Sequence, residues 1–250
     1  MATGCSPAIL LYRRASQRFD PLREMLGRHD FHAVVPPDAI AEWECADDRG
    51  TRVRYWPGTL LVECGDDARA LEFDRVHRCA MPSDRELPDG GDAPERVALV
   101  AGSDEAGKGE RDRALAVCAV ALPVAREAEA IARGVRDSKS CSADEVADLA
   151  RWIAARFAHA ERVVDCDARD AALRAHGGNE TRLLAALHAE CLRELHARAP
   201  FALARVDRFA PNRPVAAAFR TAIVDECVRG ERHAACAAAS ILARAATLRA

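Results

Sequence analysis

Two adjacent carboxylates at the end of an apolar segment are the residues best suited to chemistry. The short apolar run Val97–Ala101 fits a strand buried on both faces, and it leads directly to Asp104 and Glu105. Neighbouring carboxylates repel each other, and burial penalises the charged form of both. A divalent cation such as Mg²⁺ removes that cost, because hard ions prefer oxygen ligands and phosphate oxygens can complete their shell. A solvated turn is the usual place for an Asp-Glu pair, so the pair alone is ambiguous.

The segment that follows the pair is suited to contact a nucleic-acid strand. Gly107 and Gly109 offer backbone N–H groups that a strand can approach closely, and Lys108 between them is available for phosphate. The formal net charge is −3 and the isoelectric point is about 6.3. These values argue against binding by bulk positive charge, so any contact with nucleic acid must be local.

The sequence predicts two domains separated by a connector. Residues 79–95 concentrate Pro, Gly and Asp with little apolar content, which is typical of an exposed linker. Residues 1–78 predict a small α+β domain, with strands at Ala8–Tyr12 and Gly58–Cys64 and helices at Asp20–Leu26 and Asp66–Val76.

Residues 96–250 predict an α/β domain. The apolar run Leu115–Leu122 is close enough to the first one to pair with it as a hairpin. Ser142 and Glu145 form a capping-box pattern at the start of an amphipathic helix. Further helices are predicted over 179–198, over 214–229 and from 234 onward, and the strand Phe201–Val206 ends at Asp207.

Five motifs follow one another along the chain, which are GSDEAGKG at 102–109, GVRDSKS at 134–140, NETRLLAALHAECLREL at 179–195, VDRFA at 206–210 and AAASILAR at 237–244. In this order they make the chain resemble the type 2 ribonucleases H, and most of all ribonuclease HIII. The resemblance implies a ribonuclease H-like catalytic domain with a mixed sheet flanked by helices. It also implies cleavage of the RNA strand of RNA/DNA hybrids, which leaves 5′-phosphate and 3′-hydroxyl ends.

The same resemblance implies a metal site and its ligands. Two Mg²⁺ or Mn²⁺ ions would be held by catalytic carboxylates, which are Asp104, Glu105, Asp207 and Glu231. Glu231 is the best match to the fourth acid because it lies in the triplet Arg229-Gly230-Glu231, but Asp225 and Glu226 remain alternatives.

The residues that the resemblance implies in substrate binding are Gly107, Lys108, Gly109, Ser138, Lys139 and Asn179. Plainer roles are open to some of them. Lys139 could be a solvated turn residue, and Asn179 suits the cap of the helix that follows it. His188 lies among Leu184, Leu187 and Cys191, so we interpret it as a packed helix residue before any catalytic role.

The N-terminal domain resembles the small domain of ribonuclease HIII that is similar to the TATA-binding protein and grips the hybrid, on the segment YWPGTLLV at 55–62. Two departures from the family stand out. The segment Glu110–Ala114 replaces an aromatic residue and Gly-Pro, and the chain stops at Ala250, where the family continues with further helices. A non-catalytic hybrid-binding relative and a ribonuclease HII that cuts at embedded ribonucleotides therefore remain alternatives. The N-terminus lacks a secretory signal, and we expect a cytoplasmic monomer.

Overall fold

The computed structural model describes residues 7–13, 19–34, 43–56, 59–80, 94–110 and 112–250. These residues form two compact units, Met1–Ala98 and Leu99–Ala250. Most of the predicted connector, 79–95, lies outside the described residues. None of the helices in the described segments is long and apolar enough to cross a membrane.

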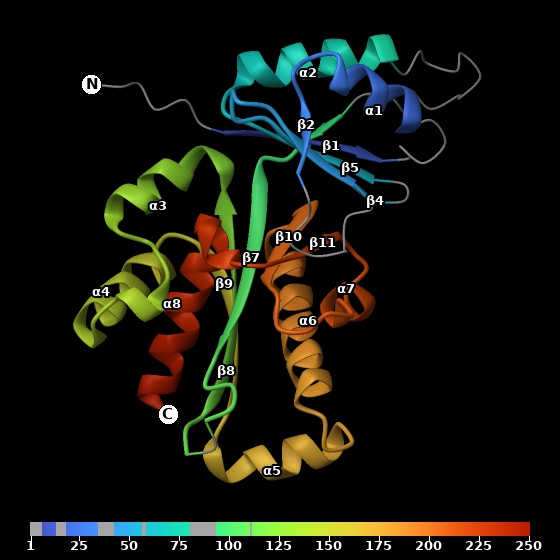
Figure 1. Cartoon of the computed structure of the whole chain (residues 1–250). Coiled ribbons are helices and arrows are strands. Elements are labelled where there is room, and N and C mark those ends of the chain that lie inside the picture. Colours follow the sequence, from blue (N-terminus) through green and yellow to red (C-terminus); the bar gives the residue numbers. More distant parts are fainter. Residues whose placement is uncertain (1–6, 14–18, 35–42, 57–58, 81–93, 111) are drawn as a thin grey trace. The chain divides into compact units, whose positions relative to one another are not determined.

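The N-terminal unit is built on an antiparallel sheet with the strand order β2-β3-β4-β5-β1-β6. The strands are β1 (Ala8–Arg13), β2 (His32–Ala33), β3 (Trp43–Ala46), β4 (Arg52–Trp56), β5 (Thr59–Cys64) and β6 (Glu95–Arg96). Helices α1 (Phe19–Gly27) and α2 (Asp67–Ala80) lie together over one face of this sheet (Figure 1). Leu22 and Leu26 of α1 and Phe73 of α2 close its apolar core.

The predicted strands and helices of this unit are all present. Strands β3 and β4 were not predicted, because charged residues such as Glu44 and Arg54 interrupt their apolar pattern. In the structure Glu44 and Arg54 are buried, and Arg52 forms an ion pair with Glu44. Resemblance to the TATA-binding protein stays a prediction.

The second unit contains a mixed sheet with the strand order β11-β10-β7-β8-β9 (Figure 1). The strands are β7 (Leu99–Ala106), β8 (Leu115–Pro123), β9 (Ala158–Val164), β10 (Leu203–Asp207) and β11 (Ile223–Cys227). The strands β7, β8 and β9 are antiparallel, whereas β10 runs parallel to β7 and β11 runs parallel to β10. The predicted α/β fold with a mixed sheet is confirmed.

Helices cover both faces of this sheet. They are α3 (Glu127–Arg133), α4 (Ala143–Ala154), α5 (Cys166–Ala175), α6 (Glu180–Arg198), α7 (Pro214–Ala218) and α8 (Ala234–Arg249). Helix α6 contacts β7, β8 and β9 from one side, and α8 contacts β7 and β8 from the other (Figure 1). Because both faces are covered, every residue of β8 except Pro123 is buried, which explains its continuous apolar sequence.

Most predicted elements of the second unit are confirmed, including the hairpin of β7 and β8 and the capping box of Ser142 and Glu145 on α4. The helix predicted over 214–229 is wrong. Helix α7 ends at Ala218, and Ile223–Cys227 is the buried strand β11. The segment forms a strand because it pairs in parallel with β10 at the edge of the sheet, and this tertiary contact outweighs its local helical pattern.

Gly102 of β7 allows α8 to approach the sheet more closely than any side chain would. A Cβ atom at this position would lie 2.0 Å from the carbonyl carbon of Ala235 and 2.3 Å from the backbone nitrogen of Cys236. Both contacts are with helix backbone, which cannot move aside as a flexible side chain could. The first turn of α8 therefore rests directly on the strand that carries Asp104.

Gly102→Ala should destabilise the second unit by about 2–3 kcal/mol, because the added methyl group forces α8 away from β7. Urea unfolding followed by circular dichroism measures this loss. Gly65→Ala is the matched control, because its backbone φ is not positive and no atom lies within 4 Å of the added Cβ. Wild-type stability of Gly102→Ala would contradict the close approach.

Candidate active site

The acid pair lies inside strand β7 rather than in a turn. Asp104 is 8% exposed, and the side chain of Glu105 is 9% exposed. Because successive strand residues point to opposite faces, the two carboxylates reach different helices. Asp104 accepts hydrogen bonds from the backbone N–H of Glu105, at 2.8 Å, and from Ser240 of α8.

Asp207 lies beside this pair at the end of β10. The parallel register places Val206 opposite Ser103, so Asp207 follows next to Asp104. Its Oδ1 atom accepts a hydrogen bond of 2.7 Å from the backbone N–H of Gly230. Only glycine fits at position 230, because a Cβ atom there would lie 2.8 Å from the Cα of Asp207.

Repulsion between carboxylates contributes to the raised pKa values of Asp104 and Asp207. Burial raises the pKa of Asp104 well above its usual range, and the charges of Glu105 and Asp207 raise it further. Burial raises the pKa of Asp207 despite the lowering effect of the Gly230 hydrogen bond, and the charges of Glu105 and Glu231 raise it further. The three acids and Glu231 thus form one electrostatic cluster.

The pKa of Glu105 is lowered rather than raised, because this residue has cationic and hydrogen-bonding partners. Burial raises its pKa, but the hydrogen bond and charge of His188 and the charge of Lys108 lower it below the usual value overall. The Nε2 atom of His188 lies 3.2 Å from Glu105 Oε2, and Lys108 Nζ lies 3.5 Å from Oε1. Glu105 is therefore held as a carboxylate.

His188 of α6 is fully buried, as predicted for a packed helix residue. Its Nδ1 atom lies 2.7 Å from the hydroxyl oxygen of Ser103, and its ring stacks on Phe209 at 5.2 Å. The contact with Glu105 was not predicted. Since Ser103, Glu105 and Phe209 all contact the imidazole, His188 fixes the orientation of one carboxylate of the cluster.

The carboxylate cluster is suited to divalent cations by its donor set. In the part of the chain that the structure describes, no group of three or more His, Cys, Asp or Glu side chains is arranged as a ready metal-ligand set. The carboxylates instead accept hydrogen bonds from Glu105, Ser240, His188 and Gly230. Buried, mutually repelling oxygen donors fit a hard divalent ion, which would relieve the repulsion.

The alternatives for the fourth acid are positioned differently. Glu231 lies in the short 3₁₀ helix Gly230–Arg232, and its charge acts on Asp207. Asp225 and Glu226 are almost completely buried in β11, at 3% and 1% exposure. The Oε1 atom of Glu226 accepts a hydrogen bond of 2.8 Å from the backbone N–H of Ala216.

Several residues predicted to bind substrate surround the cluster. Lys108 extends across the ring of Phe209 at 5.2 Å and is 40% exposed at its side chain. The charge of Lys139 lowers the pKa of Asp207, which places this exposed lysine near the carboxylates. Buried Ser138 lies 2.8 Å from Ser240, the residue that hydrogen-bonds to Asp104.

Asn179 and the two glycines have local structural roles. The Oδ1 atom of Asn179 accepts a hydrogen bond of 3.1 Å from the backbone N–H of Arg182, so this side chain caps α6. The structure gives no contact between Asn179 and the carboxylates. Gly107 and Gly109 both have positive φ angles, 84° and 76°, which favour glycine in the turn between β7 and β8.

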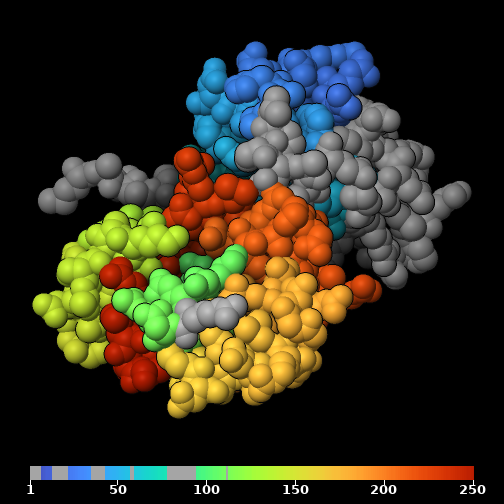
Figure 2. Space-filling view, turned by 60° about the horizontal axis from the view of Figure 1, so that its bottom comes forward, coloured from blue at the N-terminus to red at the C-terminus, as the bar shows by residue number. Residues whose placement is uncertain are grey.

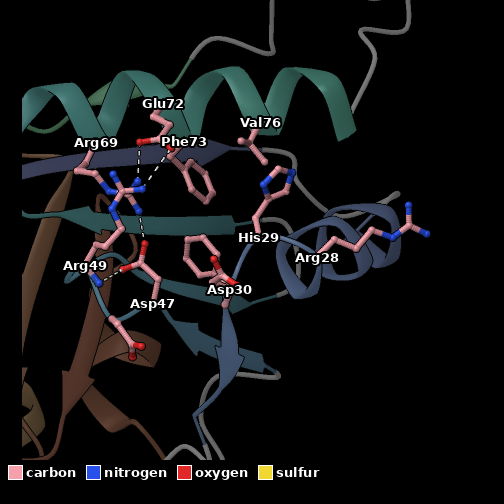
Figure 3. Close-up of a pocket in the computed structure, with 11 residues that line it drawn as sticks. Arg28, His29, Asp30, Asp47, Arg49, Arg69, Glu72, Phe73 and Val76 are labelled. Carbon is pink, nitrogen blue, oxygen red and sulfur yellow. Dashed lines mark hydrogen bonds and ion pairs between the residues drawn. The ribbon is translucent and has the colours of Figure 1, made fainter.

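A separate cavity of about 460 Å³ lies in the N-terminal unit (Figure 3). None of the predicted site residues lines it. Arg69 donates hydrogen bonds to Asp47, to Thr51 and to Glu72, so opposite charges in its wall neutralise one another. We assign this cavity no part in the chemistry of the carboxylate cluster.

Solved structures with a similar fold come from ribonucleases H. Bst-RNase HIII in complex with Mn²⁺ is 24% identical, with a TM-score of 0.54 over 96% of this chain and 81% of that chain. RNase H3 of Aquifex aeolicus is 18% identical, with a TM-score of 0.53 over 96% and 84%. RNase HII in the PCNA:RNase HII complex from Archaeoglobus fulgidus is 28% identical, with a TM-score of 0.50 over 60% and 72%.

The fold is therefore similar to that of the type 2 ribonucleases H, including solved ribonuclease HIII structures. The model of the ribonuclease HII family matches residues 101–250, and the chain belongs to this family. A comparison with curated proteins gave no match. The predictions that the chain is a type 2 ribonuclease H, and that it is an enzyme of the endonuclease class, are confirmed.

Asp104→Asn should stabilise the protein in metal-free buffer at pH 7, by about 1–2 kcal/mol, because it removes a buried repelling charge while its amide oxygen still accepts. An acid whose folded pKa is raised costs stability as the pH rises through its unfolded and folded pKa values. The gain should therefore vanish below about pH 4, where Asp104 is protonated in both states. Thermal unfolding in a chelator measures it.

Asp112→Asn is the control, because Asp112 is exposed in the turn between β7 and β8. It should leave the unfolding temperature unchanged at both pH values. Equal effects of the two substitutions would show that Asp104 is not repelled by its neighbours.

Proposed function

We propose that this protein is an endoribonuclease that hydrolyses the RNA strand of RNA/DNA hybrids and leaves 5′-phosphate and 3′-hydroxyl ends. The observation that carries the proposal is the convergence of Asp104, Glu105 and Asp207 at the ends of two neighbouring parallel strands. Membership of the ribonuclease HII family, shown above, supports this reaction class.

Asp104, Glu105, Asp207 and Glu231 would hold the metal ions. Two Mg²⁺ or Mn²⁺ ions would supply an activated water and stabilise the leaving 3′ oxygen. The similar Bst-RNase HIII has been solved in complex with Mn²⁺, which supports a divalent metal here. The pKa values of Asp104 and Asp207 are raised, and a bound cation would relieve the repulsion that contributes to this. His188 keeps Glu105 ionised and oriented.

Glu231 is the fourth acid that the contacts favour. Its charge reaches Asp207, whereas a carboxylate oxygen of Glu226 is already bound to the backbone of Ala216. Asp225 is almost fully buried within β11. Glu231 is only partly buried in its short 3₁₀ helix, so its carboxylate is more accessible to a cation than those of Asp225 and Glu226.

The substrate would meet backbone amides and lysines beside the cluster. Gly107, Lys108 and Gly109 would contact the RNA strand at its ribose 2′-hydroxyl groups, which distinguish RNA from DNA. Lys139 would contact phosphate, with Ser138 supporting the turn that carries it. Asn179 would bind the substrate at the N-terminal end of α6, which this residue caps. The N-terminal unit, residues 1–78 in the sequence-based division, would grip the hybrid as a domain similar to the TATA-binding protein.

Asp104→Asn should abolish cleavage of an RNA/DNA hybrid while binding of the hybrid stays within about twofold of wild type, because this change removes metal affinity and no phosphate contact. A cleavage assay with labelled RNA in Mg²⁺ or Mn²⁺, together with a gel-shift assay, measures both. Wild-type turnover in this variant would exclude the proposed site.

The wild-type protein in the same assay separates the alternatives. A non-catalytic relative would shift the hybrid without cutting it in either metal. A ribonuclease HII-like enzyme would cut a DNA duplex that contains a single ribonucleotide as readily as the full hybrid. We expect cleavage of the full hybrid at many positions and little cleavage at a single ribonucleotide.

Glu231→Gln should lower kcat by about 100-fold or more and raise the Mn²⁺ concentration that gives half-maximal activity, because it removes a charge next to Asp207. Glu226→Gln is the matched control, since an amide oxygen can still accept the hydrogen bond from Ala216. Kinetic assays at several Mn²⁺ concentrations distinguish them. A larger effect of Glu226→Gln than of Glu231→Gln would show that Glu226 of β11 is the fourth ligand.

A further inference from the structure

A buried arginine outside the carboxylate cluster holds the turn between β7 and β8. Arg169 of α5 is only 3% exposed. Its Nη1 atom donates to the backbone carbonyl groups of Gly107 at 2.9 Å, of Glu110 at 2.5 Å and of Arg113 at 3.1 Å. One guanidinium group thus donates hydrogen bonds to carbonyl groups at the start, the middle and the end of the turn. We call residues 107–110, 112 and 113 the hairpin loop.

A carboxylate completes this arrangement. The Nη2 atom of Arg169 donates to Oε1 of Glu180 at 2.8 Å, and the same oxygen lies 3.5 Å from the backbone nitrogen of Gly109. The side chain of Arg169 is 4% exposed and that of Glu180 is 34% exposed. A charge this deeply buried is tolerated only when it is paired and hydrogen-bonded, so the arginine depends on these partners.

Backbone hydrogen bonds within the hairpin loop use the same carbonyl groups as this arginine. Within the loop, the backbone of Glu110 donates to Gly107 at 3.2 Å and that of Arg113 donates to Glu110 at 3.5 Å. Both acceptor carbonyl groups are among those that Arg169 binds. Figure 2 shows the loop in green beside the yellow segment that contains α5.

The conformation of the loop decides where Lys108 and the glycine amides lie. Gly107 has a φ of 84°, and a Cβ atom there would lie 2.1 Å from the carbonyl oxygen of Ala114. Lys108 leaves this turn toward the carbonyl oxygen and ring of Phe209, at 3.4 Å and 5.2 Å, and toward Glu105. A shift of the Gly107 carbonyl group would move this lysine relative to the acid cluster.

We propose that Arg169, anchored by Glu180, is a positioning residue that fixes the hairpin loop so that Gly107, Lys108 and Gly109 meet the nucleic-acid strand. This inference rests on the proposed function, because it assigns the loop to that substrate. Arg169 itself is buried, and its hydrogen bonds go to the hairpin loop and Glu180 rather than to the carboxylate cluster. Its effect is therefore on binding of the hybrid rather than on the reacting groups.

Arg169→Met tests the inference because it keeps the apolar stem and removes every hydrogen bond. The dissociation constant for a labelled RNA/DNA hybrid in Ca²⁺ and the KM for cleavage in Mg²⁺ should both rise about tenfold, with kcat within about twofold of wild type. Arg169→Lys should restore part of the affinity. Arg174→Met, the same substitution at an exposed position of α5, should match wild type.

Glu180→Ala is the second variant, in case Arg169→Met fails to fold. It leaves the arginine in place without its carboxylate anchor and should raise KM and the dissociation constant about threefold. Hydrogen exchange of the peptide that contains the hairpin loop should be faster in both variants than in Arg174→Met. Exchange reports on the loop even if the protein cleaves no hybrid.

The outcomes separate this inference from the proposed function. Weaker hybrid binding with faster loop exchange supports positioning by Arg169, and it does so even if the wild type binds without cutting, which would refute only the proposed cleavage. Unchanged exchange, or unchanged hybrid binding despite faster exchange, overturns the inference. A loss of kcat and unfolding temperature with unchanged KM would also overturn it, since it would show a purely structural arginine.

Discussion

Repulsion among Asp104, Glu105 and Asp207 is the constraint around which the second unit is organised. These carboxylates lie on strands buried in the middle of a sheet, where water cannot screen them well. Each is stabilised by a donor from another element. Asp104 is bonded by Ser240, Glu105 by His188 and Asp207 by the backbone of Gly230.

Helices α6 and α8 supply donors to these carboxylates, and the pairing of β10 with β7 brings them together. Helix α8 brings Ser240 to one face of β7, and the absence of a side chain at Gly102 lets it approach closely. Helix α6 brings His188 to the opposite face. Parallel pairing of β10 with β7 brings Asp207 alongside, because the carboxyl ends of parallel strands lie at the same edge. A site assembled from both faces of a sheet needs both helices in place.

Local patterns predicted much of this arrangement, whereas long-range contacts decided what they missed. The capping box of α4 and the Asn179 cap of α6 are local and were predicted correctly. The segment Ile223–Cys227 was wrongly predicted as helix. It is a strand because it pairs with β10, about 20 residues earlier, and this pairing has no local sequence signal.

Side-chain roles show the same division. The acid pair could be identified from its spacing to the Gly-Lys-Gly segment, yet its position inside β7 could not be predicted from an apolar run that ends earlier. The contact of His188 with Glu105 joins residues 83 positions apart, and Arg169 reaches carbonyl groups that carry no sequence signal at all. Backbone acceptors are present in every residue, so only the fold can show which of them converge.

Anomalous diffraction from crystals grown with Mn²⁺ and a hybrid that cannot be cleaved would show directly whether these carboxylates hold two metal ions. We expect two manganese peaks within the ligand distance of carboxylate oxygens of Asp104, Glu105 and Asp207, with Glu231 as the fourth acid. Manganese bound elsewhere, or a hybrid bound in the crystal with no manganese at these carboxylates, would contradict it.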